Sequence, residues 1–143
     1  MNKKTEQISP SYMMQHKHTT GIVMVCVTRQ RTCERLIALG KTAAEKSGLP
    51  LHVVHAVKTG ENILGNVYEG EALEYLFTAA QLSGGELTVI RADNVLEALY
   101  EYALAHSAVA IVLGQSPQAA PEMGRGLMGR LQKALPDTEV IID

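Results

Sequence analysis

Apolar residues follow two periods that alternate along the chain. Continuous apolar runs are typical of parallel strands buried on both faces, whereas apolar residues three or four positions apart predict amphipathic helices. The runs predict five strands, at residues 21–27, 51–57, 86–91, 108–113 and 139–142. Between them the helical spacing predicts four helices, with apolar stripes within residues 33–44, 72–80, 96–104 and 127–135.

The alternation of strands and helices predicts the fold class. Such an order gives right-handed crossovers and a parallel sheet covered on both faces. We therefore expect an α/β fold, a three-layer Rossmann-like sandwich whose five-stranded parallel sheet has the order 3-2-1-4-5 and carries four helices. The first strand takes the centre because residues 22–27 are apolar throughout. Residues 1–20 are polar and predict a flexible tail, so the domain comprises residues 21–143.

Polar residues mark where the expected helices begin. Thr32 is expected to cap the first helix, and Asn94 with Glu97 forms a capping box for the third. In the second helix, Leu73 and Phe77 fall on the same stripe as the other apolar residues. Both side chains are therefore expected to point inward.

Composition and charge narrow the class of protein. The chain has 143 residues and a formal net charge of -2 at pH 7, so one domain without a basic field is expected. This charge argues against nucleic acid or a membrane surface as a partner. No apolar run is long enough to span a bilayer, and the first residues do not form a secretory signal. A cytoplasmic location is therefore expected.

The cysteines and histidines give no clear site. Cys26 and Cys33 are too few for a disulfide framework. Cys33 opens the first helix, where the helix dipole can lower the pKa of a thiol, but a small half-buried residue is the simpler interpretation. His52 and His55 lie three positions apart on a strand and so point to opposite faces. No metal site is expected, because zinc needs several convergent ligands.

The loops that follow the strands carry the candidate binding residues. In open α/β sheets these loops meet at the carboxyl edge, where ligands bind. Arg29, Arg31 and Arg125 either surround an anion there or are solvated loop residues, and Val57 and Leu113 could flank an adenine. The full candidate set is Thr28, Arg29, Arg31, Val57, Asp93, Leu113, Gly114, Gln115, Ser116, Arg125 and Gly126.

The sequence gives little support for catalysis. Ser116 has no nearby base and no nucleophile-elbow context, and Asp93 is better explained as a helix-start residue than as a general base. No catalytic residue is assigned, and an enzyme is the less favoured class. A glycine turn at residues 124–126 could cradle a phosphate at a helix N-terminus, but Pro117 and Pro121 in the same loop lack amide donors.

Several short motifs, in order and spacing, resemble the universal stress protein family. The similarity is closest to the universal-stress-type domain of osmosensitive potassium-channel sensor kinases, and it covers roughly residues 21–143. The motifs that carry the resemblance are Met24–Val27, Cys33–Leu36, Asp93–Leu99, Tyr102–Ala103, Ile111–Gly114, Gly129–Leu131 and Leu135–Asp137.

The resemblance implies an ATP site between the first and fourth strands, with a signature of Gly, two residues, Gly, nine residues, then Gly with Ser or Thr. Gly114 matches the first glycine of the signature, but Pro117 stands where the second glycine is required. The final pair of the signature falls on residues 127–128, which do not match it, and Arg125–Gly126 is the nearest equivalent. The acidic residue that often follows the first strand is Thr28 here. Weak or absent ATP binding is therefore expected, although ATP or another adenine nucleotide stays open as a cofactor.

The resemblance also implies an assembly and a function. In the family the last strands of two subunits pair across a two-fold axis, which here gives a homodimer through Val140, Ile141 and Ile142. The expected function is a regulatory or binding module in stress response or signalling, with a regulatory protein as a further partner. Two alternatives stay open, a protein that binds ATP or AMP and a weak nucleotide hydrolase.

Overall fold

The computed structural model describes residues 20–114, 129 and 133–143. The expected tail at residues 1–20 lies outside the described residues except for its last one. The elements, in chain order, are β1 (Ile22–Cys26), α2 (Gln30–Ser47), β2 (Leu51–Lys58), the 3-10 turn η1 (Ile63–Gly65), α3 (Glu69–Leu82), β3 (Glu86–Ala92), α4 (Val95–His106), β4 (Ala108–Leu113) and β5 (Glu139–Ile142).

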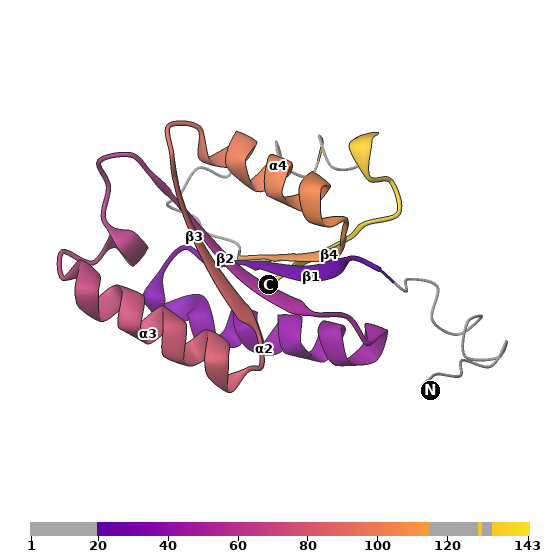
Figure 1. Cartoon of the computed structure of the whole chain (residues 1–143), viewed down its shortest axis with the longest axis horizontal. Helices are drawn as coiled ribbons and strands as arrows, with labels where there is room; N and C mark the ends of the chain where they lie inside the picture. Colours follow the sequence, from indigo (N-terminus) through magenta and orange to yellow (C-terminus); the bar gives the residue numbers. More distant parts are fainter. Residues whose placement is uncertain (1–19, 115–128, 130–132) are drawn as a thin grey trace, which may run out of the picture.

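The five strands form one sheet in the order β3-β2-β1-β4-β5, and every neighbouring pair is parallel. This confirms the predicted order and the central place of β1. The helix α4 covers one face of the sheet, and α2 and α3 cover the other (Figure 1). The described part holds three α-helices where four were expected, because the expected last helix falls on residues of which only 129 and 133–135 are described.

The core divides into two clusters, one on each face of the sheet. All five residues of β1 are buried, as its continuous apolar run predicts. Alternate residues point to opposite faces, so Val23 and Val25 pack with residues of α2 and α3, while Met24 and Cys26 pack with residues of α4. None of the helices in the described part is long and apolar enough to cross a membrane.

The helix α2 begins two residues before the expected cap. Its N-cap is Arg29, with an extended backbone, and Thr32 lies in the first turn, where its hydroxyl donates to the Arg29 carbonyl over 3.2 Å. The expectation of a Thr32 cap was therefore wrong, because the side chain closes the turn from within. Farther along, Gly40 lies against the sheet, and a Cβ there would overlap Cγ2 of Val25. Only glycine lets α2 approach β1 this closely.

The helix α3 buries a narrower stripe than its sequence predicts. Ala72, Leu76 and Ala80 are buried, but Leu73 is 43% exposed and Phe77 is 56% exposed. The expectation that both would point inward was wrong. The reason is position, because α3 lies beneath the edge strand β3 and no described element covers its outer flank (Figure 1).

The start of α4 agrees with the sequence. The side chain of Asn94 accepts a hydrogen bond of 3.0 Å from the amide of Glu97, which confirms the predicted N-cap. This contact fixes the first turn of α4 at the carboxyl edge of the sheet, where β1 and β2 also end.

Candidate functional site

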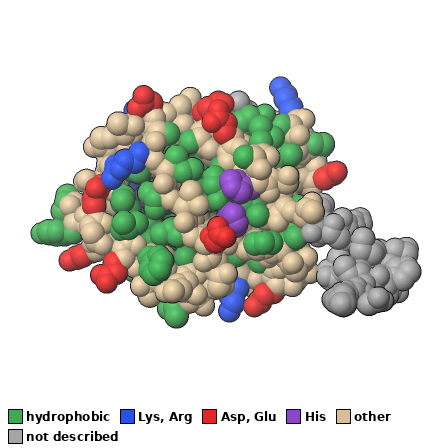
Figure 2. Space-filling model, in the orientation of Figure 1, with side chains coloured by type: hydrophobic (Ala, Val, Ile, Leu, Met, Phe, Trp, Pro, Cys, Tyr) green, Lys and Arg blue, Asp and Glu red, His purple; other side chains and the backbone are tan. Residues whose placement is uncertain are grey.

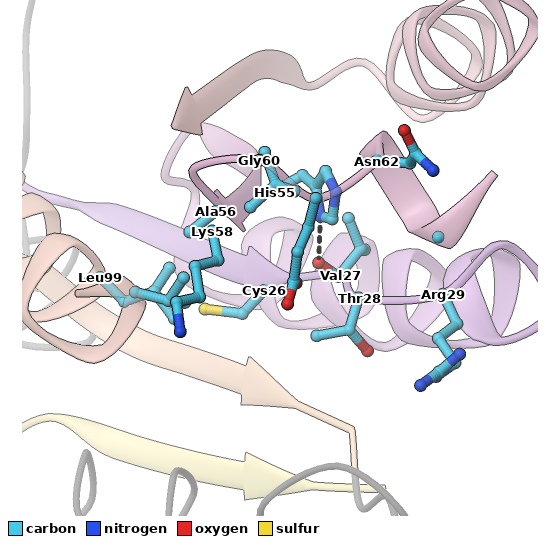
Figure 3. Close-up of a pocket in the computed structure, with 14 residues that line it drawn as sticks. Cys26, Val27, Thr28, Arg29, His55, Ala56, Lys58, Gly60, Asn62 and Leu99 are labelled. Carbon is cyan, nitrogen blue, oxygen red and sulfur yellow. Dashed lines mark hydrogen bonds between the residues drawn. The ribbon is translucent and has the colours of Figure 1, made fainter. Parts of the chain in front are cut away.

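A cavity of about 510 Å³ opens at the carboxyl edge of β1 and β2 (Figure 3). The ends of these two strands, the loop at residues 60–65 and the first turns of α4 line it. Its floor is apolar and buried, with Cys26, Val27, Val57 and Leu99 all at most 5% exposed. A volume of this size lies in the range of small-molecule sites, which is about 300–1,000 Å³.

His55 fastens the loop to the sheet. Its Nδ1 lies 2.8 Å from the carbonyl oxygen of Val27, and its Nε2 lies 2.9 Å from the amide nitrogen of Leu64. Because a carbonyl only accepts and an amide only donates, Nδ1 carries the proton and Nε2 is the acceptor. Burial lowers the pKa of His55, and the nearby Arg91 acts in the same direction, while the bond to Val27 opposes them. The ring is therefore neutral, with both nitrogens used.

A left-handed backbone turn shapes the loop. Leu64 has φ 54° and ψ 20°, yet its side chain is only 5% exposed. This conformation costs a non-glycine residue roughly 1–2 kcal/mol, so surrounding contacts must maintain it. The hydrogen bond from the Leu64 amide to His55 and the burial of the leucine side chain are those contacts.

An ion pair holds the loop from the other side. Arg91 on β3 donates through Nη2 to both carboxylate oxygens of Glu69, each over 2.9 Å, and through Nη1 to the carbonyl of Glu61. The amide of Ile63 donates to Glu69 as well. These hydrogen bonds hold the pKa of Glu69 below its ordinary value. The loop that walls the cavity is thus tied to β2, β3 and α3.

Two cations stand at the mouth of the cavity. Arg29 follows β1 and Lys58 ends β2, and both side chains are exposed and line the opening. Within the described part of the chain, neither forms an ion pair with a carboxylate. Glu61 is the one acidic residue among the described lining residues. An apolar floor below two unpaired cations suits a ligand with a flat apolar part and an anionic group.

The two thiols do not supply a nucleophile. Burial raises the pKa of Cys26, which lines the cavity, to about 12. Burial and the neighbouring Glu34 raise the pKa of Cys33 to about 11. The interpretation of Cys33 as a thiol of lowered pKa was wrong. Cys33 is a small packing residue, but it is fully buried rather than half-buried as expected, and its Sγ donates to the Arg29 carbonyl. Both cysteines are free.

The structure brings together only part of the candidate set. Thr28, Arg29 and Val57 line the cavity. Four other candidates lie away from its lining: Arg31 in the first turn of α2, Asp93 exposed before α4, and Leu113 and Gly114 at the end of β4. The remaining four, Gln115, Ser116, Arg125 and Gly126, lie outside the described residues. Whether any of the eleven binds a ligand stays a prediction.

Sequence reasoning missed most of the cavity wall. It did not select His55, Lys58, the loop at residues 60–65, or Val95 and Leu99 of α4. One signal could have found the loop, because residues 58–67 are rich in glycine and asparagine and follow a buried strand. A similar pattern drew attention to the residues that follow β4 in the sequence, which lie outside the described part. The described residues contain no group of three side chains that could hold a metal ion.

The sequence matches no model of a known protein family and no curated protein. Solved structures do match in fold. A universal stress protein from Archaeoglobus fulgidus superposes with a TM-score of 0.61 at 21% identity, over 91% of this chain and 98% of that one. A universal stress protein from Burkholderia pseudomallei superposes with a TM-score of 0.58 at 19% identity, over 87% of this chain and 96% of that one.

Two similar structures contain nucleotides. The Archaeoglobus fulgidus universal stress protein in complex with dAMP has a TM-score of 0.57 at 21% identity, over 86% of this chain and 96% of that one. A universal stress protein in complex with cAMP has a TM-score of 0.62 at 16% identity, over 88% of this chain and 98% of that one. At these identities the likeness establishes the fold: the chain is an α/β sandwich with the universal stress protein fold.

Proposed function

We propose that the chain is a member of the universal stress protein family that acts as a regulatory module and binds an adenine nucleotide at the carboxyl edge of β1 and β2. One observation carries the proposal: the cavity has a buried apolar floor and two unpaired cations, Arg29 and Lys58, at its mouth. Adenine suits the floor, and a phosphate suits the cations. The dAMP and cAMP in similar structures support this class of ligand.

The favoured ligand is a nucleoside monophosphate rather than ATP. A triphosphate needs a chain of donors, which a glycine-rich loop usually supplies through its amides. Here the sequence after β4 contains Pro117 and Pro121, which lie outside the described residues and have no backbone N–H to donate. Arg29 and Lys58 supply enough charge for one phosphate group. We therefore expect AMP or cAMP to bind more tightly than ATP.

Calorimetric titration of the purified protein with AMP, cAMP and ATP tests this proposal. We expect AMP or cAMP to bind and the variants Arg29→Ala and Lys58→Ala each to weaken that binding by about tenfold. Arg31→Ala is the matched control, because this exposed arginine lies in the same turn of α2 but outside the cavity. Absence of binding by all three nucleotides, or tighter binding of ATP, would contradict the proposal.

Hydrolysis of the nucleotide is not part of the proposal. Among the residues that line the described cavity, the histidine uses both nitrogens for the backbone, and the pKa of the cysteine is about 12. Neither is a general base or a nucleophile. Release of a product from bound ATP, followed by chromatography, would instead favour the weak hydrolase.

We also propose that the protein is a homodimer, assembled through β5. Val140 packs on the α4 side of the sheet and Ile141 on the other, while Ile142 is 46% exposed. The strand has β4 as its sole partner in the described part, so its other edge is open to a second copy.

We propose a cytoplasmic location, because two free cysteines suit a reducing compartment. The proposed regulatory role also requires a partner protein on which this chain acts.

Sedimentation of wild-type protein at tens of micromolar tests the dimer. Val140→Lys and Ile141→Pro are expected to give monomers, because one places a charge in the interface and the other disrupts strand pairing. Leu104→Lys, an exposed leucine on α4, is the control and should leave the mass unchanged. A wild-type chain that stays monomeric rules out the β5 interface.

A further inference from the structure

One attachment of the cavity wall depends on the charge of an imidazole. Nδ1 of His55 donates to the carbonyl of Val27 over 2.8 Å (Figure 3), and Nε2 accepts from the amide of Leu64 over 2.9 Å. A protonated imidazole carries a hydrogen on both nitrogens and has no acceptor. In that state the amide of Leu64 would face a second N–H group instead of a lone pair.

Protonation therefore removes the contact with Leu64 and keeps the contact with Val27. The carbonyl of Val27 still accepts from a charged ring, and a charged donor makes that hydrogen bond stronger. His55 and Leu64 are only 3% and 5% exposed, so bulk water cannot replace the lost acceptor unless the loop moves. The ring should stay with β1, and the loop should leave the ring.

The turn at Leu64 borders the cation that we assign to the phosphate. Leu64 has φ 54°, which is unfavourable for a residue with a Cβ, and the bond to His55 is one of the contacts that maintain it. The next residue, Gly65, lines the cavity, and a Cβ there would lie 3.9 Å from Nη1 of Arg29. A relaxed turn at Leu64 would thus move the wall beside the guanidinium.

The groups around His55 favour its neutral form. On the elements that surround the ring, β3 presents Arg91, α3 presents Glu69 and α2 presents the buried Cys33. Glu69 is bonded to Arg91, and the pKa of Cys33 is about 11, so neither offers a free negative charge to the ring. At the mouth of the cavity lie Arg29, Lys58 and Glu61.

These surroundings set the direction of the pH effect. Burial lowers the pKa of His55 and Arg91 acts in the same direction, while the bond to Val27 opposes them. The folded protein therefore takes up this proton only below about pH 6.5, the ordinary pKa of histidine. The contact with Leu64 is complete above that pH and is lost as the pH falls farther.

We propose that His55 is a positioning residue for the nucleotide, which holds the cavity wall as a neutral ring and releases both wall and ligand when it is protonated. This inference rests on the proposed nucleotide site and adds regulation by acid to it. At neutral pH the wall is held and the affinity is high. In acid the turn at Leu64 relaxes, and the affinity falls.

The other two histidines of the described part lie on the opposite side of the sheet. His52 bonds to Tyr102 of α4, and His106 ends that helix and stacks on the same tyrosine. Figure 2 shows histidine side chains at the surface, whereas His55 is buried. Burial lowers the pKa of His52 as well. His52→Gln is therefore a matched control, because it removes an acid-titrating ring of the same strand that does not hold the loop.

Nuclear magnetic resonance of the ligand-free protein tests the release of the wall. As the pH falls from 7.5 to 5, the amide signal of Leu64 should shift with the same midpoint as the His55 ring. Hydrogen exchange of this amide, corrected for the intrinsic effect of pH, should become about tenfold faster. Both changes should persist in His52→Gln. A His55 ring that stays neutral down to pH 5, or a Leu64 amide that does not follow the ring, would overturn the proposal.

Calorimetry with cAMP tests the link to the ligand. cAMP is the probe because its phosphodiester keeps one charge, whereas a phosphate monoester such as AMP takes up a proton at about pH 6. Wild-type protein and His52→Gln should bind cAMP about tenfold more weakly at pH 5 than at pH 7.5. In His55→Gln the amide cannot titrate, so its affinity should be the same at both pH values.

Two calorimetric results would contradict the role of His55. One is a wild-type affinity that does not change with pH, and the other is an equal fall in His55→Gln. If cAMP does not bind, AMP takes its place, and His55→Gln then corrects for the proton that AMP itself takes up. Absence of binding by both nucleotides at pH 7.5 would contradict the proposed nucleotide site instead. The titration of Leu64 in ligand-free wild-type protein would still decide whether His55 holds the wall.

Discussion

His52 and His55 lie three residues apart on β2 and face opposite sides of the sheet, as the sequence predicts. His55 lies under α2 and α3, and both of its ring nitrogens contact backbone groups. His52 lies under α4, and its Nδ1 is 2.7 Å from the hydroxyl of Tyr102. That hydroxyl is also 3.1 Å from the hydroxyl of Thr88. One histidine therefore serves the main chain, and the other belongs to a side-chain cluster.

The difference shows how partners decide what a buried histidine does. Side chains can rotate to new partners when one member of a cluster changes, whereas Val27 and Leu64 have their backbone groups fixed by the fold. His52 also has Glu86 3.8 Å away and the ring of His106 at a centroid distance of 5.3 Å. Burial lowers the pKa of His52, His106 acts in the same direction, and Glu86 opposes them. The main-chain role should be the less replaceable of the two.

Exchanging each histidine for phenylalanine tests this contrast most strongly. His55→Phe leaves the Val27 carbonyl and the Leu64 amide without partners in a buried site, which should lower the free energy of unfolding by about 3 kcal/mol. His52→Phe should lower it by about 1 kcal/mol, because Tyr102 keeps Thr88. Urea denaturation measures both values. An equal or larger loss for His52→Phe would contradict the view that the main-chain contacts of His55 are the less replaceable ones.

Acid should act on the two histidines in the same direction. The pKa of each is lower in the folded protein than in the unfolded chain, so the unfolded chain takes up the proton first. Their contribution to stability is full above about pH 6.5 and is lost as the pH falls below that value. Urea denaturation at pH 7.5 and at pH 5.5 should show this loss. In His55→Gln the glutamine cannot titrate, so the loss of stability between pH 7.5 and pH 5.5 should be smaller. An unchanged loss would mean that groups other than His55 cause the pH dependence.

Tyr102→Phe tests how much the side-chain cluster around His52 contributes to stability. The hydroxyl contacts both His52 and Thr88, yet the site is only part-buried, so the free energy of unfolding should fall by about 1 kcal/mol. Tyr68→Phe is the matched control, since that tyrosine is 67% exposed, and it should leave stability unchanged. A loss as large as that of His55→Phe would mean that the cluster is no more adaptable than the backbone contacts.

The smallest effect is expected at the ion pair that assists His55. Glu69→Gln weakens the contacts with Arg91 and with the amide of Ile63 at an exposed position. Global stability should hardly change, because exposed ion pairs contribute little. Hydrogen exchange at the Ile63 amide should become a few-fold faster, while exchange in β1 stays as it was. Unaltered exchange at Ile63 would leave His55 as the main attachment of the loop.

Periodicity predicted the sheet well, since buried strands such as β1 are apolar throughout and their order follows from short crossovers. It failed at Leu73 and Phe77, because helical spacing shows which residues share a stripe but not how wide a surface the neighbours cover. Residue type misled at Thr32, because a threonine whose hydroxyl closes the first turn from within looks the same in the sequence as a threonine at the N-cap.

The candidate site was predictable only in part. Strand ends place Thr28, Arg29 and Val57 at the carboxyl edge without knowledge of side-chain contacts. His55 was invisible as a site residue, because its role depends on Val27 and Leu64, which meet it only after folding. The position of a histidine along a strand does not show which groups it will contact after folding.

The hydrogen bonds of His55 also make the cavity wall depend on the centre of the sheet. The carbonyl of Val27 reaches its place when β1 pairs with β2, as the 3.0 Å bond from the Val27 amide to the Val54 carbonyl shows. That carbonyl orients the imidazole, so that Nε2 accepts from the amide of Leu64 and helps to keep that residue in its left-handed conformation. The wall of the cavity therefore depends on contacts that the pairing of β1 with β2 provides. Occupancy of the cavity would report whether the centre of the sheet is intact.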